Sequence, residues 1–261
     1  MRIAVAATAP FGADVLERLA ARHEVVALLT RPNKPAGRGR VSRPPAAKVA
    51  AERLGIPVLQ PERPTVELEL PAETVVVCAY GLLIPASLLE RGLWLNVHPS
   101  LLPRWRGAAP VERALLAGET ETGVTIHKTV AELDAGPIAA QRSFPLTVED
   151  DAGAVYSRSA ALAVELLDEV LPAPTFHPQA GEPTYAAKIG PADRELDLTR
   201  PAESLNRIRA LSPHIGARGD LDGRRVTIWR ARLEAGALMP IEVQPEGKRR
   251  MGYDEFVRGL G

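Results

Sequence analysis

The sequence contains one cysteine, few aromatic residues and no long hydrophobic run. Cys78 is its only cysteine, and Phe, Trp and Tyr make up 4% of its 261 residues. A lone cysteine cannot form an internal disulfide and is typical of a reducing compartment. The apolar runs at 74–79 and 81–85 are far shorter than the roughly 20 residues of a membrane-spanning helix. Residues 3–9 indicate a first β-strand rather than a secretory signal. We therefore expect a cytoplasmic protein with no membrane partner.

The motifs of several enzyme classes are also absent. There is no GxSxG elbow, no Walker A loop and no HExxH, and the histidines and the cysteine show no metal-ligand spacing. Gly37 and Gly39 resemble part of a dinucleotide fingerprint, but they follow prolines rather than a strand and the third glycine is missing. We therefore expect neither a metal site nor a dinucleotide site. Four histidines are interpreted as structural or exposed: His23, His127, His177 and His214.

Charge is balanced in total and uneven along the chain. The 32 basic and 32 acidic residues cancel, yet residues 31–48 contain six cations and no anion. Cations are also in surplus after residue 188. The segment from Arg31 to Arg43 contains prolines and glycines, which is typical of a flexible basic arm that becomes ordered on nucleic-acid phosphates. A solvated run of charge explains it equally well. Only five cations are lysines, which fits phosphate recognition, a GC-rich genome or a warm habitat.

Short β-branched runs alternate with helical patterns along the first 171 residues. Strands that alternate with helices, several of them apolar on both faces, predict a Rossmann-like α/β fold with a mostly parallel sheet. The predicted strands are 3–8, 24–30, 57–60, 74–80, 93–98, 123–130 and 137–146, and the predicted helices are 13–22, 44–55, 109–117 and 152–170.

Prolines and glycines are dense between residues 172 and 190, as in an interdomain linker. A second, smaller unit follows, with a helix that begins at Pro201, strand-like runs at 225–232 and 238–243, and a terminal segment at 253–260. The predicted division is thus a first domain at 1–171, a linker at 172–190 and a second domain at 191–261.

Asn96 and His98 belong to the strand-like run 93–98. Side chains alternate across a strand, so both project from the same face, and Pro99 ends the strand directly after them. Open α/β sheets bind ligands at the carboxyl ends of their strands, so both side chains can act on one substrate atom there. The alternative is that they only satisfy backbone groups at a strand end.

Residues 100–110 look like the wall of a pocket. Asp134 lies in a turn, where aspartate more often bonds its own backbone than takes part in catalysis.

Two long runs are unusually specific: NVHPSLLPRWRGAAP (96–110) and GVTIHKTVAELDAGPI (123–138). Both resemble the methionyl-tRNA formyltransferase family. Further matches are RPNKPAGRGR (31–40), VVVCAYGLLIP (75–85), TYAAKI (184–189) and QPEGKRRM (244–251), which together cover most of the chain in order. NVHPSLLP and LDAGPI occur in variant form throughout the folate-dependent formyltransferases. The PAGRGR loop, the RWRGAAP run and the C-terminal unit indicate the tRNA-directed members.

The resemblance implies transfer of the formyl group of 10-formyltetrahydrofolate to the α-amine of methionine on initiator tRNA, without a metal, by a protein expected to be a monomer. Acyl transfer between nitrogens passes through a tetrahedral oxyanion and needs a proton carrier. Asn96 suits the oxyanion as an amide donor, and His98 can donate to the same oxygen or handle the proton. Asp134 would orient His98 and favour its charged form.

The resemblance also implies two sets of binding residues. The folate site comprises Ala79, Tyr80, Gly81, Leu82 and Leu83, together with Ser100, Leu101, Leu102 and Pro103. The tRNA contacts comprise Lys34, Arg38, Arg40 and Arg43 of the arm, and Lys248, Arg249 and Arg250 of the C-terminal unit.

The tail departs from the family's pattern. After residues 226–234, which resemble the first full strand of the family's OB-like C-terminal barrel, an internal piece is missing. We therefore expect a reduced, partly open β unit. Two alternative functions stay open: a folate-dependent formyltransferase acting on an amino sugar or nucleotide, and a noncatalytic nucleic-acid-binding remnant. Retention of Asn96, His98 and Asp134 argues against the remnant.

Overall fold

The computed structural model describes residues 1–36 and 41–259, which divide into two compact units. The first comprises Met1–Arg106, Gly123–Ser143 and Ser157–Thr184, and the second comprises Gly107–Thr122, Phe144–Tyr156 and Tyr185–Gly261. The domain boundaries after residues 171 and 190 stay a prediction of the sequence.

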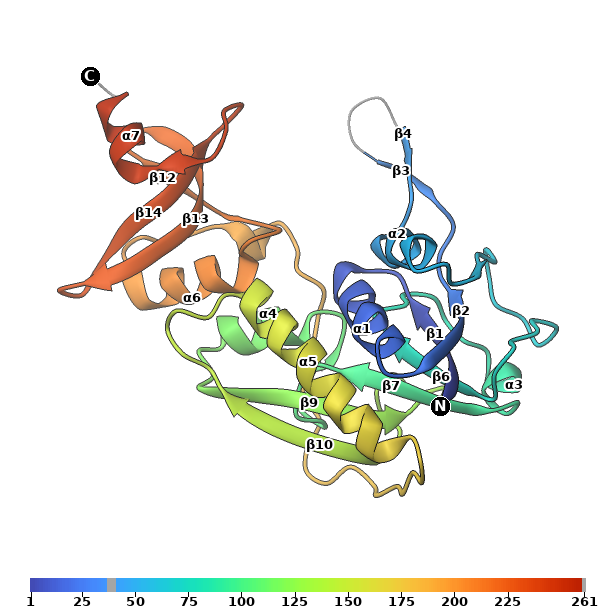
Figure 1. The fold of residues 1–261 in the computed structure, drawn as a ribbon. Coiled ribbons are helices and arrows are strands. Elements are labelled where there is room, and N and C mark those ends of the chain that lie inside the picture. Colours follow the sequence, from blue (N-terminus) through green and yellow to red (C-terminus); the bar gives the residue numbers. More distant parts are fainter. Residues whose placement is uncertain (37–40, 260–261) are drawn as a thin grey trace. The chain divides into compact units, whose positions relative to one another are not determined.

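A seven-stranded sheet forms the centre of the first unit (Figure 1). Its strands follow the order β10-β9-β7-β6-β1-β2-β5. The five strands from β7 to β5 pair in parallel, and β9 pairs with β7 in the antiparallel sense. The mostly parallel α/β sheet predicted from the sequence is therefore confirmed. The strands are β1 (Arg2–Ala7), β2 (Glu24–Leu29), β5 (Val58–Leu59), β6 (Thr74–Cys78), β7 (Leu93–His98), β9 (Glu121–Lys128) and β10 (Ile138–Pro145).

Both faces of the central strands are buried. On one face, Ala4 and Ala6 of β1 pack in a cluster with Trp94 of β7 and Leu88 of the short helix α3 (Ala86–Leu89). Helix α1 (Pro10–Ala20) begins with a proline at its first turn and packs close to the strands. A Cβ at Gly12 of α1 would lie 2.5 Å from the carbonyl oxygen of Cys78, so this glycine permits the close approach. The remaining helices that begin before residue 171 are α2 (Ala46–Arg53), α4 (Pro110–Leu116) and α5 (Ala152–Val170).

The stem of the basic arm is a β-hairpin. Strands β3 (Lys34–Ala36) and β4 (Val41–Arg43) pair in the antiparallel sense, with Lys34 opposite Arg43. Figure 1 shows this hairpin extending away from the sheet beside α2. The sequence predicts only a flexible arm here, because each strand is too short to show an alternating pattern. Arg38 and Arg40 lie outside the described residues.

A small antiparallel sheet forms the C-terminal part of the second unit, with the order β12-β13-β14-β15. Ile208, Val226, Ile228 and Val243 form its core together with Phe256. The separate small β unit agrees with the reduced, partly open unit expected from the shortened tail. Its elements are α6 (Pro201–Leu211), β12 (Ala217–Leu221), β13 (Arg224–Glu234), β14 (Ala237–Pro245), β15 (Met251–Gly252) and α7 (Tyr253–Arg258). Three short elements complete the chain: β8 (Arg106–Gly107), β11 (Tyr185–Ala186) and the 3₁₀ turn η1 (Ala192–Arg194).

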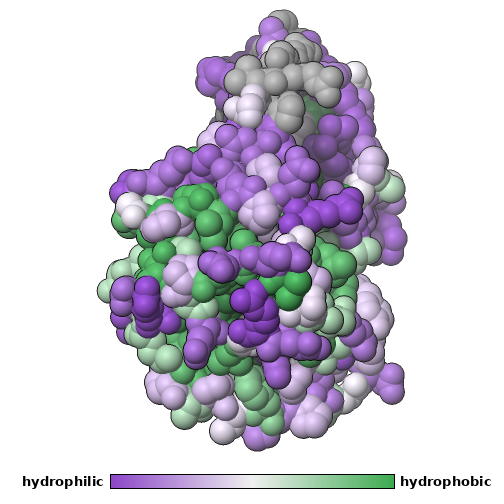
Figure 2. Space-filling view, turned by 90° about the vertical axis from the view of Figure 1, so that its right-hand side faces the viewer, coloured by the Kyte–Doolittle hydropathy of each residue, from purple (hydrophilic) through white to green (hydrophobic). Residues whose placement is uncertain are grey.

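The surface is mixed in character. Figure 2 shows hydrophilic residues over much of one face, with hydrophobic patches between them. Within residues 1–36 and 41–259, no helix combines the length and the apolar composition needed to cross a membrane.

Candidate active site

Asn96 and His98 lie at the carboxyl end of β7, on one face of the strand. Trp94, two residues before Asn96, packs in the apolar cluster on the α3 side of the sheet. Because alternate residues share a face, Asn96 and His98 continue that face to the edge of the sheet. The neighbouring antiparallel strand β9 places His127 opposite Asn96 and Thr125 opposite His98.

Asp134, in the loop between β9 and β10, meets both side chains. The Asn96 amide donates to Oδ1 of Asp134 over 3.0 Å, and Oδ2 of Asp134 lies 3.7 Å from Nδ1 of His98. The side chains of His98 and Asp134 are only 6% and 9% exposed, so their charges are weakly screened. The three residues that the sequence singles out are therefore brought together around one point.

A glycine and a distant glutamine hold the Asp134 loop. Asp134 has a φ of 48°, a left-handed conformation that aspartate tolerates better than most residues. At Gly136 a Cβ would lie 1.7 Å from the Lys128 carbonyl oxygen, so only glycine fits there. The amide of Gln179 donates to the carbonyl oxygens of Asp134 (2.7 Å) and Gly136 (2.9 Å), and its oxygen accepts two bonds from Arg106. Gln179 thus clamps this loop from a segment that the sequence predicts as linker.

The Trp105 carbonyl fixes the tautomer of His98 and leaves one ring nitrogen available. Its Nε2 lies 2.8 Å from the carbonyl oxygen of Trp105, which can only accept, so Nε2 carries the proton. Nδ1 then presents a lone pair toward Asp134, at a distance too long for a direct hydrogen bond. Burial lowers the pKa of His98 and outweighs the opposing effects of Asp134 and the Trp105 carbonyl; His127 also lowers it. The sequence analysis expects Asp134 to orient the His98 imidazole. In the structure the hydrogen bond to the Trp105 carbonyl oxygen orients it.

His127, which the sequence analysis interprets as structural or exposed, is a buried member of the cluster. Its Nδ1 lies 3.0 Å from the carbonyl oxygen of Lys128 and therefore donates, which leaves Nε2 to accept from the Asn96 amide over 3.0 Å. Asn96 thus directs one N–H to Asp134 and the other to His127. The side chain of His127 is 2% exposed. His127 lies opposite Asn96 because β7 and β9 pair in the antiparallel sense. The sequence does not show this pairing, so it could not predict the contact.

Strained backbone gathers around the same point. Five non-glycine residues among those described have a positive φ, and Ala79 (47°), Trp105 (61°) and Asp134 are three of them. Such conformations cost of order 1–3 kcal/mol each and concentrate at functional sites. Ala79 directly follows β6, the parallel neighbour of β7. The strain agrees with the choice of this edge as the candidate functional edge.

The predicted folate residues fall into an exposed group and a buried group. Leu83 is 82% exposed, and Ala79 and Gly81 are exposed as well, whereas the Tyr80 side chain is buried. Leu82 and Leu101 are partly buried, and Ser100, Leu102 and Pro103 are buried. Thr125 bonds both the carbonyl oxygen of Ser100 (2.7 Å) and the N–H of Leu102 (3.2 Å). The segment 100–103 therefore supports the site as a fixed wall.

The predicted tRNA-binding residues of the C-terminal unit differ in their contacts with the rest of that unit. The Arg250 guanidinium stacks 3.4 Å from the centre of the Trp229 ring and donates to the Pro213 carbonyl oxygen. Arg249 forms an exposed ion pair with Glu255. Arg250 thus packs against the small sheet, while the exposed side chain of Arg249 stays accessible to a partner.

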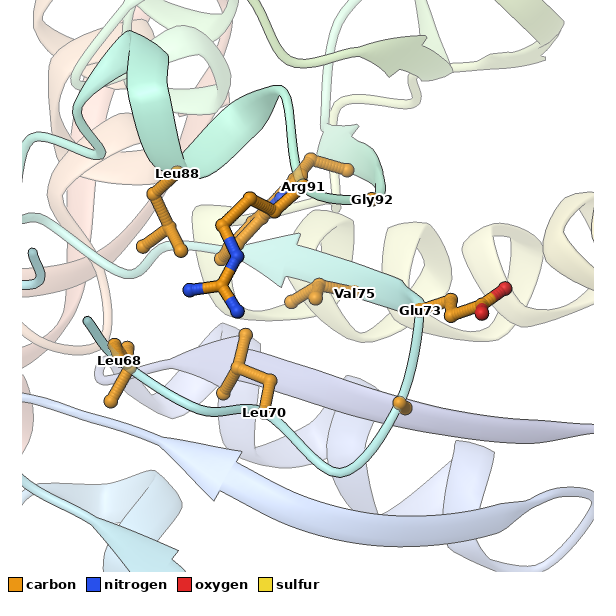
Figure 3. A pocket seen from close by; sticks show the side chains of 9 residues that line it. Leu68, Leu70, Glu73, Val75, Leu88, Arg91 and Gly92 are labelled. Carbon is orange, nitrogen blue, oxygen red and sulfur yellow. The ribbon is translucent and has the colours of Figure 1, made fainter. Parts of the chain in front are cut away.

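A small hollow in the first unit lies away from this cluster. A cavity of about 50 Å³ is lined by Leu68, Leu70, Leu88 and Arg91 near the start of β6, as Figure 3 shows. The catalytic candidates lie near the opposite, carboxyl end of the parallel strands. This hollow therefore forms no part of the candidate site.

Comparison with known proteins identifies relatives along the whole chain. The family model described as formyl transferase matches residues 1–171. The methionyl-tRNA formyltransferase of Cereibacter sphaeroides is 41% identical, over 100% of this chain and 96% of that protein. The methionyl-tRNA formyltransferase of Listeria monocytogenes is 40% identical, over 97% of this chain and 94% of that protein.

Solved structures share the fold. Methionyl-tRNA formyltransferase from Clostridium thermocellum has a TM-score of 0.66 at 17% identity, covering 94% of this chain and 98% of that one. An N-formyltransferase from Helicobacter canadensis, in complex with folinic acid and dTDP-3-aminofucose, has a TM-score of 0.67 at 19% identity, covering 89% of this chain and 87% of that one. At these identities the structural likeness concerns the fold alone.

Proposed function

Because the chain belongs to the methionyl-tRNA formyltransferase family, we propose that Asn96, His98 and Asp134 transfer the formyl group of 10-formyltetrahydrofolate to the α-amine of methionine on initiator methionyl-tRNA. The product, formylmethionyl-tRNA, supports the initiation of translation. The observation that carries the proposal is the meeting of an amide, an imidazole and a carboxylate at one sheet edge. These three side chains fit a formyl group carried by folate, because formyl transfer needs a hydrogen-bond donor to the formyl oxygen and a group that moves a proton.

His98 moves the proton in this scheme. Its Nδ1 lone pair accepts the proton that the α-amine releases as the new carbon–nitrogen bond forms. The resulting imidazolium faces Asp134 Oδ2 at 3.7 Å, and that carboxylate stabilises its charge. The same proton then passes to the folate nitrogen as its bond to the formyl carbon breaks. Neutral His98 is the form that burial favours, so the base is ready near neutral pH.

Asn96 stabilises the negative charge that develops on the formyl oxygen. In the structure its two N–H groups point to Asp134 Oδ1 and His127 Nε2. The formyl oxygen is an acceptor of the same kind, so it replaces one of these acceptors in the transition state. A donor of this kind contributes roughly 10²- to 10³-fold to the rate.

The substrates approach from the two sides of the cluster. Ala79, Tyr80, Gly81, Leu82 and Leu83, with the wall at 100–103, hold the pterin next to Asp134. The tRNA acceptor end meets the basic arm, through Lys34 and Arg43 of the hairpin and through Arg38 and Arg40. Lys248, Arg249 and Arg250 extend the contact in the C-terminal unit. The arm contains cations and no acid between residues 31 and 48, which favours a phosphate backbone as the partner.

We also propose a monomer, located in the cytoplasm where initiator tRNA is used. Light scattering on the purified protein gives a mass near 28.0 kDa if this is right. A mass of twice that value contradicts the monomer and leaves the chemistry untouched.

The function is tested directly with defined substrates. The protein is incubated with 10-formyltetrahydrofolate and methionyl-tRNA, and formylmethionine and free tetrahydrofolate are measured together. Equal amounts of the two products are expected. Parallel reactions contain free methionine or an amino-sugar nucleotide as acceptor. Turnover with a small amine and none with methionyl-tRNA contradicts the proposal, and no turnover with any acceptor favours a noncatalytic protein.

A further inference from the structure

The Arg31 side chain reaches back across the sheet edge toward the candidate site. Arg31 lies just beyond the carboxyl end of β2, which is separated from β6 by β1. A Cβ placed on Gly81, just after β6, would lie 3.4 Å from Arg31 Nη1 and 3.8 Å from its Cδ. The guanidinium therefore lies over the loop that follows β6, and β6 is the direct neighbour of β7 with its Asn96 and His98.

Leu29 and Trp94 share one face of the sheet. Leu29, the last residue of β2, and Trp94 of β7 pack in the same apolar cluster. Asn96 continues that face of β7, because alternate residues of a strand share a face. Arg31 follows the end of β2, and its guanidinium lies at the loop after β6, the strand next to β7.

The backbone of Arg31 is fixed, while its guanidinium charge has no partner among the described residues. The Arg31 carbonyl oxygen accepts from the Gln60 amide over 2.8 Å, and Gln60 in turn accepts from Lys48 over 2.8 Å. Nε of Arg31 is buried and has no hydrogen-bond partner in the described part of the chain, and the guanidinium forms no ion pair there. A buried donor without an acceptor costs about 1–3 kcal/mol, and more when it is charged. A bound anion would remove that cost.

The Tyr80 hydroxyl is a second donor without a partner at this place. It too is buried and has no hydrogen-bond partner within residues 1–36 and 41–259. Burial raises the pKa of Tyr80 to about 12, and the charge of Arg31 opposes that rise, so the two groups lie in one environment. A neutral hydroxyl and a guanidinium both offer hydrogens to an incoming oxygen anion.

The position of this pair in the sheet also favours a ligand. The chain runs from β1 outward to β2 in one direction and to β6 in the other, so the strand order reverses between β1 and β6. Open α/β sheets bind ligands in the crevice outside the carboxyl ends at such a switch point. Arg31 and Tyr80 follow the strands on the two sides of β1.

We propose that Arg31 binds the phosphodiester next to the terminal adenosine of the acceptor tRNA and thereby positions the methionyl α-amine at Asn96 and His98. The basic hairpin continues directly from Arg31 through Lys34 to Arg43, with no acidic residue in between. A nucleic-acid strand that follows these cations ends at the catalytic cluster. The proposal rests on the proposed function, and it gives Arg31, the first residue of the basic arm, one defined phosphate partner and a part in placing the methionyl amine.

The test compares Arg31→Gln with the unsubstituted protein in steady-state formylation of methionyl-tRNA. Loss of hydrogen bonds from a charged group predicts a fall in kcat/KM of roughly 10- to 100-fold. The slope of log kcat/KM against log salt concentration becomes less steep by about 0.7, the value for one single-strand phosphate. The KM for 10-formyltetrahydrofolate stays unchanged. Arg2→Gln is the matched control, since Arg2 is an exposed cation at the opposite end of the strands.

Arg31→Lys separates charge from geometry. A lysine keeps the charge and loses the planar fork, so the salt slope is retained while kcat/KM falls several-fold. Should Arg31→Gln fail to fold, unchanged kcat/KM in Arg31→Lys overturns the proposal.

Each remaining outcome has one meaning. Unchanged kcat/KM and salt slope in folded Arg31→Gln overturn the proposal. A rise confined to the KM for 10-formyltetrahydrofolate also overturns it, because the anion at Arg31 is then a folate carboxylate. Absence of formylation by the unsubstituted protein is a failure of the proposed function itself, and it is seen before any variant is compared.

Discussion

Asn96 and Asp134, 38 residues apart in the chain, are joined by a hydrogen bond of 3.0 Å from the side-chain amide to the carboxylate. The bond places the carboxylate beside the imidazole of His98, on the same side of β7. Because the Asn96 amide also donates to His127, its orientation is determined by two acceptors. The cluster is therefore arranged before any substrate arrives, which reduces the reorganisation needed in the transition state.

Replacement of Asn96, His98 or Asp134 by alanine is expected to lower kcat by about 10²-fold or more, because each change removes a transition-state contact or the proton carrier. Formylation of methionyl-tRNA is measured for each variant, with circular dichroism to verify the fold. Leu133→Ala is the control, since Leu133 adjoins Asp134 and is 64% exposed. A folded variant with near-normal turnover removes its residue from the mechanism.

The pH profile of Asp134→Asn is expected to shift on its acidic side. Burial holds the pKa of His98 below 6.5, and the Asp134 charge partly offsets this. The base form therefore predominates at pH 7, and protonation of His98 reduces kcat/KM as the pH falls. Without the Asp134 carboxylate the pKa of His98 falls further, so the acidic limb of the profile moves to lower pH. The plateau value of kcat/KM drops as well, because the imidazolium loses its stabilising charge. The ionisation of the acceptor amine affects both pH profiles equally and does not change the difference between them. An acidic limb that moves to higher pH in Asp134→Asn contradicts His98 as the base.

Gln179→Met is expected to reduce kcat about 10-fold, since methionine keeps the length of the side chain and removes its hydrogen bonds to Asp134 and Gly136. Arg106 loses its acceptor as well. Single-turnover rates with saturating substrates report the effect on chemistry. Leu133→Ala serves again as the control, because Leu133 adjoins Asp134 and its side chain is exposed. Equal rates for Gln179→Met and the unsubstituted protein show that the clamp is dispensable.

Acid is expected to destabilise the second unit through Asp193. Arg113 donates to both carboxylate oxygens of Asp193, at 2.8 and 2.9 Å, and this pairing lowers the pKa of Asp193 below 3.8. A carboxyl with a lowered pKa adds stability above its ordinary pKa and loses that contribution as pH falls through the lowered value. The free energy of unfolding of Asp193→Asn should therefore be lower at pH 7 and depend less on pH in the acidic range. Urea titrations at several pH values measure this, and parallel curves for the two proteins refute it.

The sequence by itself determined the α/β sheet, the family and the position of the candidate site along the chain. These features depend on local patterns: alternation along 93–98, strands separated by helices, and the NVHPSLLP and LDAGPI runs. Each is written within a few neighbouring residues, so no distant contact is needed to see it.

The tertiary structure alone decided which groups complete the site. His127 meets Asn96 through the pairing of two antiparallel strands, and Gln179 reaches Asp134 across 45 residues. Arg31 meets the loop at Gly81 only because β2, β1 and β6 are neighbours in the sheet. Contacts of this kind depend on strand order and loop path, and a residue's own neighbours in the chain carry no trace of them.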